Sequence, residues 1–487
     1  MPTHTLMGNQ EPEVILSPIE SSWTAKEFAR IDLGDRRLDA RLLSVSGDLA
    51  AQPQAPINQA CQDWAATKAA YRLFDNEKAQ AERILFPHQQ RTRERMAAYA
   101  RVLAIQDTAL FNYSAHPMTQ GLGPIGTPEQ NLHGLVMHST LVHSLQGLPL
   151  GLATQEIWAR DEATVEEQQQ QQQQQQKKKK KKQRPIEEKE SFKWITALRG
   201  TVELTPPAVE VVTVCDREAD VYEFFQEAEQ LGTKVLVRST YNRVLIGEGK
   251  LRSVMTAHPV SGYVTVQVPA HKDQPAREAL CDVRFRAVTL RPPDRPKAFG
   301  VTLSPITMDV VWVHEINPPA CVKEPLDWML FTTVPVDSFT DAVERIRWYK
   351  VRWNIEVWHK VLKSGCRVED CRLETGTKLT RYLTLMSVIA WRVFWMVQMN
   401  RHHPDADCTV VLTEHEWKAL YASIHRTTHL PETLPSVGQA IRWMAQLGGF
   451  LARKGDREPG VTVLWRGWQR LQDLALMWRV VHDTGTS

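Results

Sequence analysis

Three acidic residues that lie far apart in the chain have the surroundings that divalent-metal chemistry needs. Asp107 follows the apolar run Arg101–Ile105, Asp216 follows the β-branched run Val209–Cys215, and Glu356 lies in a basic, aromatic stretch. An apolar strand that ends in an aspartate presents a carboxylate at a sheet edge, where the sites of open sheets usually lie. Three carboxylates converging there could hold two Mg²⁺ ions and activate a water or hydroxyl for attack on a phosphodiester. Spacing alone leaves this open, because an aspartate after a strand often only caps a turn.

The stretch Arg345–Lys363 has a helical composition without Gly or Pro. Its residues Tyr349, Arg352, Glu356 and Lys363 would lie within roughly 60° of one helix face, at about 100° per residue. A solvated helix usually pairs its cations with several acids, whereas Glu356 is the lone acid among these cations. The pattern fits a metal-ligating carboxylate beside groups that hold phosphates. A basic surface helix with one incidental salt bridge is the alternative.

The order of elements around Asp216 is typical of an α/β sheet. A helix is predicted at Val221–Leu231 and a further strand at Lys234–Arg238. Two earlier strands are predicted at Gly134–Ser144 and Pro149–Ala159. Asp216 should therefore lie at the carboxyl end of a core strand.

From residue 241 to residue 333 the helical pattern disappears, which predicts an antiparallel β insertion between this sheet and the Glu356 helix. The predicted strands are Tyr263–Val268, Cys281–Leu290, Met308–His314 and Trp328–Thr332. Trp328 and Trp353 flank the candidate site in sequence and could stack on unpaired bases, although burial in the core is the commoner role of a tryptophan.

The N-terminal region is predicted to be a small helical module with a basic face. Asp35 is a plausible N-cap, and Arg36, Arg37 and Arg41 follow it. The next helical stretch, Asp63–Phe74, carries Lys68, Tyr71 and Arg72. Such a face could grip DNA, and an ordinary helical bundle with solvated arginines is the alternative.

The C-terminal part of the chain is helical in pattern from Arg381 onward. Leu383–Met399 is its most apolar segment, but it is short and contains Arg392, which favours a buried helix over a membrane span. An apolar face with Leu464, Trp465, Trp468 and Leu471 is predicted to serve self-association.

Composition limits the remaining interpretations. The 487 residues are enough for about two to four domains. Six lysines at 177–182 account for more than the formal net charge of +3, so polyanion binding must come from local patches. The tract 166–190, rich in Glu, Gln and Lys, is predicted to be a solvated loop or frayed helix, and residues 1–20 a loose tail. Seven Cys without a Cys-x-x-Cys pair indicate reduced, structural thiols.

Several short motifs occur together in this chain. Tyr349, Arg352, Glu356 and Lys363 have the spacing Y-x2-R-x3-E-x6-K. The others are IQDT around Asp107, CDREAD around Asp216, EINPP at 315–319, LGDRR at 33–37, AAYRLF at 69–74 and LGGF at 447–450. Over nearly its whole length the chain thereby resembles the bacterial cut-and-paste DDE transposases of insertion sequences that carry a Y-R-E-K signature.

The resemblance implies a ribonuclease H-like mixed α/β core, interrupted by the β insertion and flanked by helical N- and C-terminal domains. It implies that Asp107, Asp216 and Glu356 are the catalytic metal triad for two Mg²⁺ ions, which Mn²⁺ can replace. In such enzymes the end of the transferred strand is nicked. Its 3′-OH then attacks the opposite strand and gives a hairpin, which is reopened before integration.

The resemblance also implies DNA contacts. Tyr349, Arg352 and Lys363 would hold phosphates beside Glu356, and Arg238 would contact the DNA end. Trp328 would stack on a base flipped out during hairpin formation, with Trp353 near it. The N-terminal module, with Arg36, Arg37, Arg41 and Arg72, would read the terminal inverted repeats.

The implied partners are double-stranded DNA, as transposon ends and target, and a second copy of the chain paired through the C-terminal helices. A cytoplasmic, nucleoid-associated protein without a membrane partner is expected. The expected domains are DNA-end binding at 1–78, the first part of the core at 79–240, the β insertion at 241–337, the core helix with the catalytic Glu at 338–372 and dimerisation at 373–487.

Two other functions remain open at this point. A structure-specific nuclease could use the same core without strand transfer. An inactive or inhibitory DNA-binding derivative would keep the basic faces without catalysis, although the intact acidic triad and signature argue against it.

Overall fold

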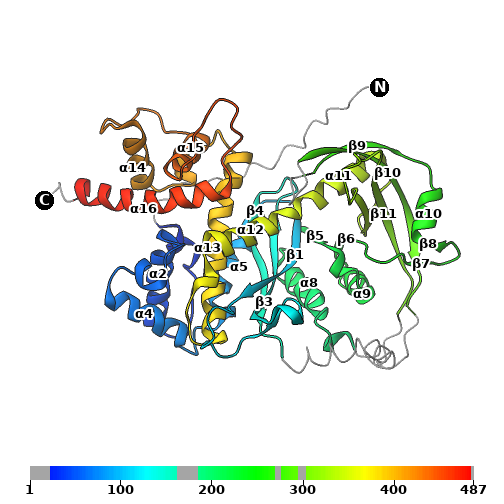
Figure 1. Ribbon diagram of the computed structural model, residues 1–487, viewed down its shortest axis with the longest axis horizontal. Coiled ribbons are helices and arrows are strands. Elements are labelled where there is room, and N and C mark those ends of the chain that lie inside the picture. The colour runs from blue at the N-terminus through cyan, green and yellow to red at the C-terminus, as the bar shows by residue number, and fades with distance from the viewer. Residues whose placement is uncertain (1–21, 162–184, 269–275, 294–302, 484–487) are drawn as a thin grey trace.

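The computed structural model describes residues 22–161, 185–268, 276–293 and 303–483 (Figure 1). The predicted tail at 1–20 and the Gln and Lys run at 168–182 lie outside the described residues. The end of the low-complexity tract lies within the described residues. Ile186–Glu188 forms a 3-10 turn, and Glu190 pairs with Arg160 at 2.7 Å.

One mixed sheet of twelve strands organises the described residues. The strands are β1 (Arg101–Asn112), β2 (Gly123–Ile125), β3 (Leu132–His143), β4 (Pro149–Trp158), β5 (Glu210–Cys215), β6 (Lys234–Arg238), β7 (Val244–Leu245), β8 (Gly249–Lys250), β9 (Gly262–Val268), β10 (Arg277–Leu290), β11 (Ile306–Glu315) and β12 (Asp327–Thr332). They lie in the order β2-β3-β1-β5-β6-β12-β11-β10-β7-β8, with β4 also beside β3 and β9 beside β10.

The centre of the sheet is parallel and its flanks are antiparallel. β1, β5 and β6 run parallel, while β3 pairs antiparallel with β1 and β12 with β6. Strands of this centre are almost fully buried, as Glu210–Cys215 illustrates, because helices cover both faces. The arrangement confirms the predicted mixed α/β fold of the ribonuclease H-like class.

Helices cover the sheet and fill one end of the molecule, whereas strands β7 to β10 lie at the other end (Figure 1). The helices are α1 (Trp23–Glu27), α2 (Arg36–Ala51), α3 (Ile57–Ala60), α4 (Trp64–Asp75), α5 (Ala81–Met96), α8 (Phe192–Leu204), α9 (Tyr222–Gln230), α10 (Leu251–Ala257), α11 (Phe339–Val351), α12 (Trp353–Lys360), α13 (Gly376–His402), α14 (Glu414–His425), α15 (Val437–Leu447) and α16 (Val461–Asp483). Helices α8 and α9 pack on one face of the sheet, and α12 and α13 on the other.

Successive side chains of a strand point to opposite faces of the sheet, so the position of a residue in its strand determines which helices it packs against. In β1, Leu103 and Ile105 belong to the core shared with α12 and α13, whereas Ala104 packs in a separate small cluster. In β5, Val214 joins the α12 and α13 side and Cys215 the α8 and α9 side. Asp107 therefore faces α12, because it is two residues beyond Ile105 in the same strand.

The β insertion continues the core sheet instead of forming a sheet of its own. The four predicted strands are present as β9 to β12, and β12 hydrogen-bonds to the core strand β6. The expectation that no helix occurs between residues 241 and 333 is wrong, because α10 covers the insertion with its buried residues Leu251 and Met255.

The apolar segment Leu383–Met399 is confirmed as a buried helix. It lies within α13, which is long and apolar enough to cross a membrane but is 94% buried within its most apolar window. Its Arg392 donates a hydrogen bond to the carbonyl oxygen of Val411 at 2.8 Å. Helix α13 runs between the sheet and the terminal helices and contacts α5, α15 and α16, so it is the central core helix.

The predicted self-association face on the last helix is wrong. Leu464, Trp465, Trp468 and Leu471 are all buried in the same chain, and the indole nitrogen of Trp468 donates to the carbonyl oxygen of Ala50 in α2 at 2.8 Å. Trp468 thereby ties the C-terminal helix to the N-terminal module, and α14 and α15 pack along the same helix. The apolar residues that α16 leaves exposed are Leu476, Met477, Val480 and Val481.

The N-terminal module begins as predicted and is tied to the core by a buried ion pair. The Asp35 carboxylate accepts a hydrogen bond from the backbone N–H of Arg37 at 2.9 Å and caps α2. Glu27 of α1 pairs with Arg95 of α5 at 2.9 Å and accepts from His88. Although burial raises the pKa of Glu27, the charges of Arg95 and His88 lower it below its usual range.

Candidate active site

Asp107 lies inside a long strand, not at the end of a short one. The predicted strand ended at Ile105, but β1 continues to Asn112 because β3 pairs along it as far as Asn112. The parallel partner β5 accompanies β1 only up to the pair Ile105 and Val214. Asp107 thus begins the part of β1 that projects beyond β5.

Asp216 follows β5 directly and caps a turn. One of its carboxylate oxygens accepts from the backbone N–H of Glu218 at 2.8 Å, which starts the 3-10 turn η3 (Arg217–Ala219). Asp216 is two residues beyond Val214, as Asp107 is two residues beyond Ile105. The parallel register therefore brings both acids to the same level at the carboxyl end of the sheet.

Glu356 reaches this level from α12, but the predicted single helix at 345–363 is divided into three pieces. Helix α11 ends at Val351, α12 begins at Trp353, and Val361–Gly365 forms a π-helical turn. Arg352 at the first junction keeps helical dihedrals (φ −50°, ψ −35°), so the direction of the chain is preserved. π-Turns within helices are rare and frequent at functional sites.

The electrostatics of Asp107 connect the three acids. Burial raises the pKa of Asp107 to about 7, the guanidinium of Arg352 opposes this shift, and the charges of Asp216 and Glu356 add to it. The carboxylates are therefore near enough to repel one another in the metal-free protein. A cation is what such a cluster of hard oxygen donors attracts.

Arg352 is the main cation among these acids. Its guanidinium donates to Glu356 at 2.5 Å and lies 6.0 Å from the centre of the Tyr349 ring. Burial lowers the pKa of Arg352, but Tyr349, Glu356 and Asp107 raise it above its ordinary value. In this structure the guanidinium of Arg352 therefore compensates the charges of the acidic residues.

Tyr349 and the two β-sheet residues of the predicted DNA contacts form one cluster. The rings of Tyr349 and Trp328 meet edge to face with centroids 5.1 Å apart. Arg238, the last residue of β6, donates to the carbonyl oxygen of Asp327 at 3.0 Å. Burial raises the pKa of Tyr349, and the nearby charges of Arg352 and Arg238 oppose this rise. Three of the predicted site residues, distant in sequence, are therefore brought together beside Arg352.

Lys363 and Trp353 have different surroundings. The ammonium group of Lys363 donates to the carbonyl oxygen of Leu110 and lies 5.1 Å from the centre of the Phe111 ring, so it ties the π-turn to β1. Trp353 is 47% exposed. Its large exposed ring at the start of α12 is available to another molecule.

His359 is a site residue that the sequence analysis missed. Its Nδ1 lies 3.7 Å from a carboxylate oxygen of Asp107, and burial, reinforced by Lys363, lowers its pKa to about 3. The neutral imidazole therefore forms part of the wall behind Asp107. Its position three residues after Glu356, on the same helix face, was the available signal.

The metal fit rests on the chemistry of these donors. Asp107, Asp216 and Glu356 offer carboxylate oxygens, the ligands that Mg²⁺ and Mn²⁺ prefer. Within the described ranges, no three His, Cys, Asp or Glu side chains are close enough to form a complete metal site. The donor types fit the ions, and Arg352 occupies only one of the two carboxylate oxygens of Glu356.

A second basic surface lies on the N-terminal module. A groove of about 440 Å³ runs between α4 and the segment that enters α13. Its lining includes Trp64, Lys68, Tyr71, Arg72, Arg372 and Lys378. Trp64 is 78% exposed. Arg36 and Arg37 are exposed at the start of α2, whereas Arg41 is partly buried, so the predicted arginines lie outside the catalytic cluster.

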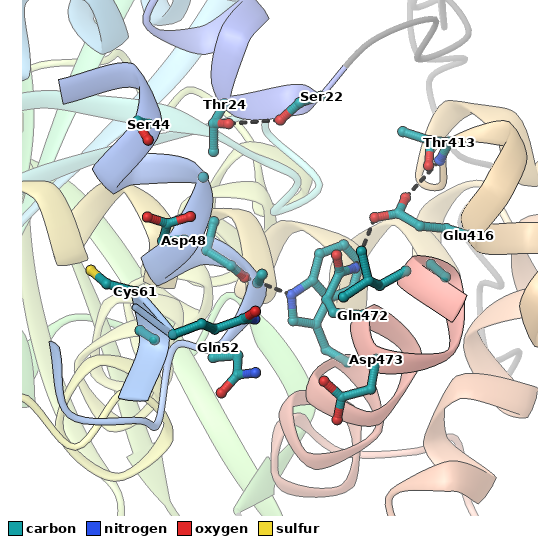
Figure 2. A pocket seen from close by; sticks show the side chains of 18 of the residues that line it. Ser22, Thr24, Ser44, Asp48, Gln52, Cys61, Thr413, Glu416, Gln472 and Asp473 are labelled. Carbon is teal, nitrogen blue, oxygen red and sulfur yellow. Dashed lines mark hydrogen bonds between the residues drawn. The ribbon is translucent and has the colours of Figure 1, made fainter. Parts of the chain in front are cut away.

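Another cavity among the described residues does not fit a polyanion. It has a volume of about 790 Å³ and lies between the N-terminal helices and α14 and α16. Figure 2 shows Asp48 on one side and Glu416 and Asp473 on the other. Burial, together with the charge of Asp63, raises the pKa of Asp48. Its acidic lining distinguishes this cavity from the two basic surfaces described above.

Three family models match the chain. The transposase DNA-binding model matches residues 20–79, the transposase DDE domain model matches residues 152–392, and the transposase Tn5 dimerisation domain model matches residues 388–481. Together they span most of the chain. The DDE match contains Asp216 and Glu356 and begins after Asp107.

Proposed function

This chain belongs to the Tn5-like DDE transposases, with nuclease and strand-transfer activity, and we propose that Asp107, Asp216 and Glu356 form its catalytic site. The observation that carries this proposal is the parallel register of β1 and β5, which brings Asp107 and Asp216 to one level beside α12, the helix of Glu356. The raised pKa of Asp107, to which Asp216 and Glu356 both contribute, supports it. Mutual repulsion among three carboxylates at the end of the central strands lowers the stability of the folded protein when no cation is bound. A bound cation would neutralise this repulsion, which is what a metal site does.

We propose that two Mg²⁺ ions, or Mn²⁺ in their place, are the cofactor. When bound, such ions lower the pKa of an attacking water or 3′-hydroxyl and stabilise the leaving oxygen. The three carboxylates would hold them. Arg352 bonds only one oxygen of Glu356, and a guanidinium at this place would also have a phosphate oxygen of the DNA as a natural partner.

The chain's own residues would position the DNA. The cluster of Arg238, Tyr349 and Arg352 offers donors to the phosphates at the end being cut. Trp328, packed against Tyr349, would receive a base flipped out of the duplex, which supports a hairpin route. Lys363, bound to β1 in this state, would contribute positive charge and hold the strand that carries Asp107.

The remaining domains would bind the DNA ends and a second copy of the chain. The N-terminal groove with its exposed aromatic and basic side chains would bind the terminal inverted repeats. The exposed apolar residues of α16 would pair two copies. The domain boundaries at 78, 240, 337 and 372 and a cytoplasmic, nucleoid-associated location stay predictions of the same proposal.

Precut transposon ends, a plasmid target and Mg²⁺ would test the proposal directly. We expect wild-type protein to join the ends to the plasmid, and Asp107→Asn, Asp216→Asn and Glu356→Gln each to lose at least about a hundredfold in rate while binding ends normally. Asp309→Asn, which changes a partly buried acid of β11, is the matched control.

The outcomes separate the candidate functions. Cleavage of ends without joining would favour a structure-specific nuclease. End binding without any metal-stimulated cleavage would favour an inhibitory derivative. Normal joining by one of the three variants would remove that residue from the triad.

A further inference from the structure

A buried aspartate terminates the turn that Asp216 begins. The 3-10 turn η3 has Asp216 at its N-terminal end and Asp220 at its C-terminal end. The side chain of Asp220 is fully buried, whereas Glu218 in the middle of the turn is exposed. An isolated charge in this position would be strongly destabilising, so the partners of Asp220 define its role.

The partners of Asp220 all come from the loop that follows β6. One carboxylate oxygen accepts from the Ser239 hydroxyl (3.2 Å), the Thr240 backbone N–H (2.7 Å) and the Tyr241 backbone N–H (3.0 Å). The other accepts from Nε of Arg243 at 2.8 Å and also from its Nη2. A single carboxylate thus fixes the path of the segment 239–243.

A second bond joins the same two segments. The Thr240 hydroxyl donates to the carbonyl oxygen of Arg217, in η3, at 2.6 Å. Arg238, immediately before the loop, donates to the carbonyl oxygen of Asp327, the residue before Trp328. The loop therefore lies between the turn of the second acid and the cluster that surrounds Trp328.

Arg243 is held as firmly as its partner. Its guanidinium lies 5.7 to 5.8 Å from the ring centres of Tyr222, Phe225 and Tyr241, and its side chain is 13% exposed. Its charge is used internally and is not offered to DNA. Tyr241 itself remains 61% exposed, as a ring fixed in place at the end of β6.

We propose that Asp220 is a positioning residue, which sets the placement of Asp216 relative to Arg238 and Tyr241 for the chemical step. The inference rests on the proposed function of Asp216 as a metal ligand. A buried ion pair is seldom the most stabilising way to fill a core. Here it specifies the separation of two active-site segments, and small misplacements of such groups cost much of a reaction rate.

Asp220→Asn tests this role, because it keeps the shape of the side chain and weakens its bonds to the N–H groups and to Arg243. On precut ends and plasmid target we expect kcat to fall at least about tenfold and the half-saturating Mg²⁺ concentration to rise. The Kd for transposon ends should stay within about twofold. Asp220→Glu, which restores the charge, should recover part of kcat.

Asp282→Asn is the matched control. Asp282 is also a buried acid paired with an arginine, Arg284, at 3.2 Å, and that arginine also stacks on an aromatic ring, Trp312, at 4.9 Å. It lies in the β insertion, away from η3. Asp282→Asn should lower thermal stability to a similar degree while kcat stays unchanged.

Equal kcat values for wild type, Asp220→Asn and Asp282→Asn would overturn the inference and leave the proposed function standing. A wild type that does not join ends would overturn the proposed function and this inference with it. If Asp220→Asn does not fold, Thr240→Val removes only the hydroxyl bond to Arg217. That variant should lose at least about threefold in kcat, and an unchanged kcat would contradict the inference.

Discussion

At the scale of single residues, the site combines acids that repel one another with cations that compensate them internally. Asp107 has its pKa raised to about 7, and Arg352 neutralises Glu356 at 2.5 Å. His359 lies behind Asp107 in its neutral form. In the absence of ligands, the charged groups of the site therefore contact one another. A bound metal ion and DNA would each replace one of these contacts.

The raised pKa of Asp107 predicts that the folding stability of the metal-free protein decreases as the pH rises. A carboxyl group whose pKa rises from 3.8 to about 7 on folding favours the folded state below pH 3.8 and loses that contribution as pH rises through 7. Asp107→Asn should therefore match wild type near pH 4 and be more stable above pH 7, by a few kcal/mol at about 1.4 kcal/mol per pKa unit.

Thermal unfolding with a chelator present, measured between pH 4 and pH 8, checks this. The melting temperature of Asp107→Asn minus that of wild type should grow with pH. A difference that stays constant over this range would show that Asp107 titrates normally, and would remove the electrostatic argument for the triad.

At the scale of elements, β12 and α11 jointly present Trp328. The ring is partly buried and packs edge to face on Tyr349, so its orientation is fixed before DNA binds. The parallel strands β1 and β5 fix the two aspartates in the same way through their register. Each functional side chain is thus placed by two elements.

Trp328→Ala should separate nicking from hairpin formation. Removing the ring takes away stacking worth about 1–3 kcal/mol per base without touching the acids, so nicking should continue while hairpins become rare. Denaturing gels of end-labelled DNA measure both products. Trp312→Ala, in the neighbouring strand β11, serves as the control, and normal hairpin yield with Trp328→Ala would contradict the stacking role.

The N-terminal end of α2 should carry part of the DNA affinity. Arg36 and Arg37 are exposed there, so replacing both by alanine should weaken end binding and reduce the slope of log K against log salt by about one per lost phosphate contact. Arg199→Ala, an exposed arginine paired with Glu227 at 2.6 Å, should leave the slope unchanged. An unaltered slope in the double variant would place the DNA elsewhere.

Much of the fold and of the candidate site could be predicted from the sequence, because strong local patterns carry that information. β6 and the strand before Asp216 were placed nearly residue by residue, since β-branched runs next to turns are unambiguous. β1 was predicted too short, because its second half depends on pairing with β3. The π-turn at Lys363 depends on tertiary packing, and no local pattern indicates it. The spacing of His359 from Glu356 indicates a shared helix face, but the contact of His359 with Asp107 depends on tertiary packing.

At the scale of the whole molecule, the terminal helices dock on each other and on the central helix α13. The prediction of an exposed apolar seam at Leu464 and Trp468 failed because amphipathic spacing shows that a face is apolar without showing what covers it. Helices α14 and α15 of the same chain cover most of it, and α2 contributes the contact to Trp468. The face left for a second copy lies further along α16.

Charges on that remaining face should prevent pairing of two DNA ends. Met477 and Val481 are 59% and 63% exposed, one helix turn apart. Changing both to glutamate should leave binding of one end intact and abolish the complex with two ends, since like charges would then face each other. Gel shifts and light scattering measure this. Leu451→Glu, at an exposed leucine outside α16, is the control, and intact two-end complexes would contradict this dimer face.

The most direct test of the account is the anomalous scattering of Mn²⁺ in crystals of the protein with precut end DNA. We predict peaks about 2 Å from carboxylate oxygens of Asp107, Asp216 and Glu356, with Arg352 turned from Glu356 toward a phosphate. Manganese bound elsewhere, or any one of the three carboxylates lying far from every peak, would contradict the proposed catalytic site.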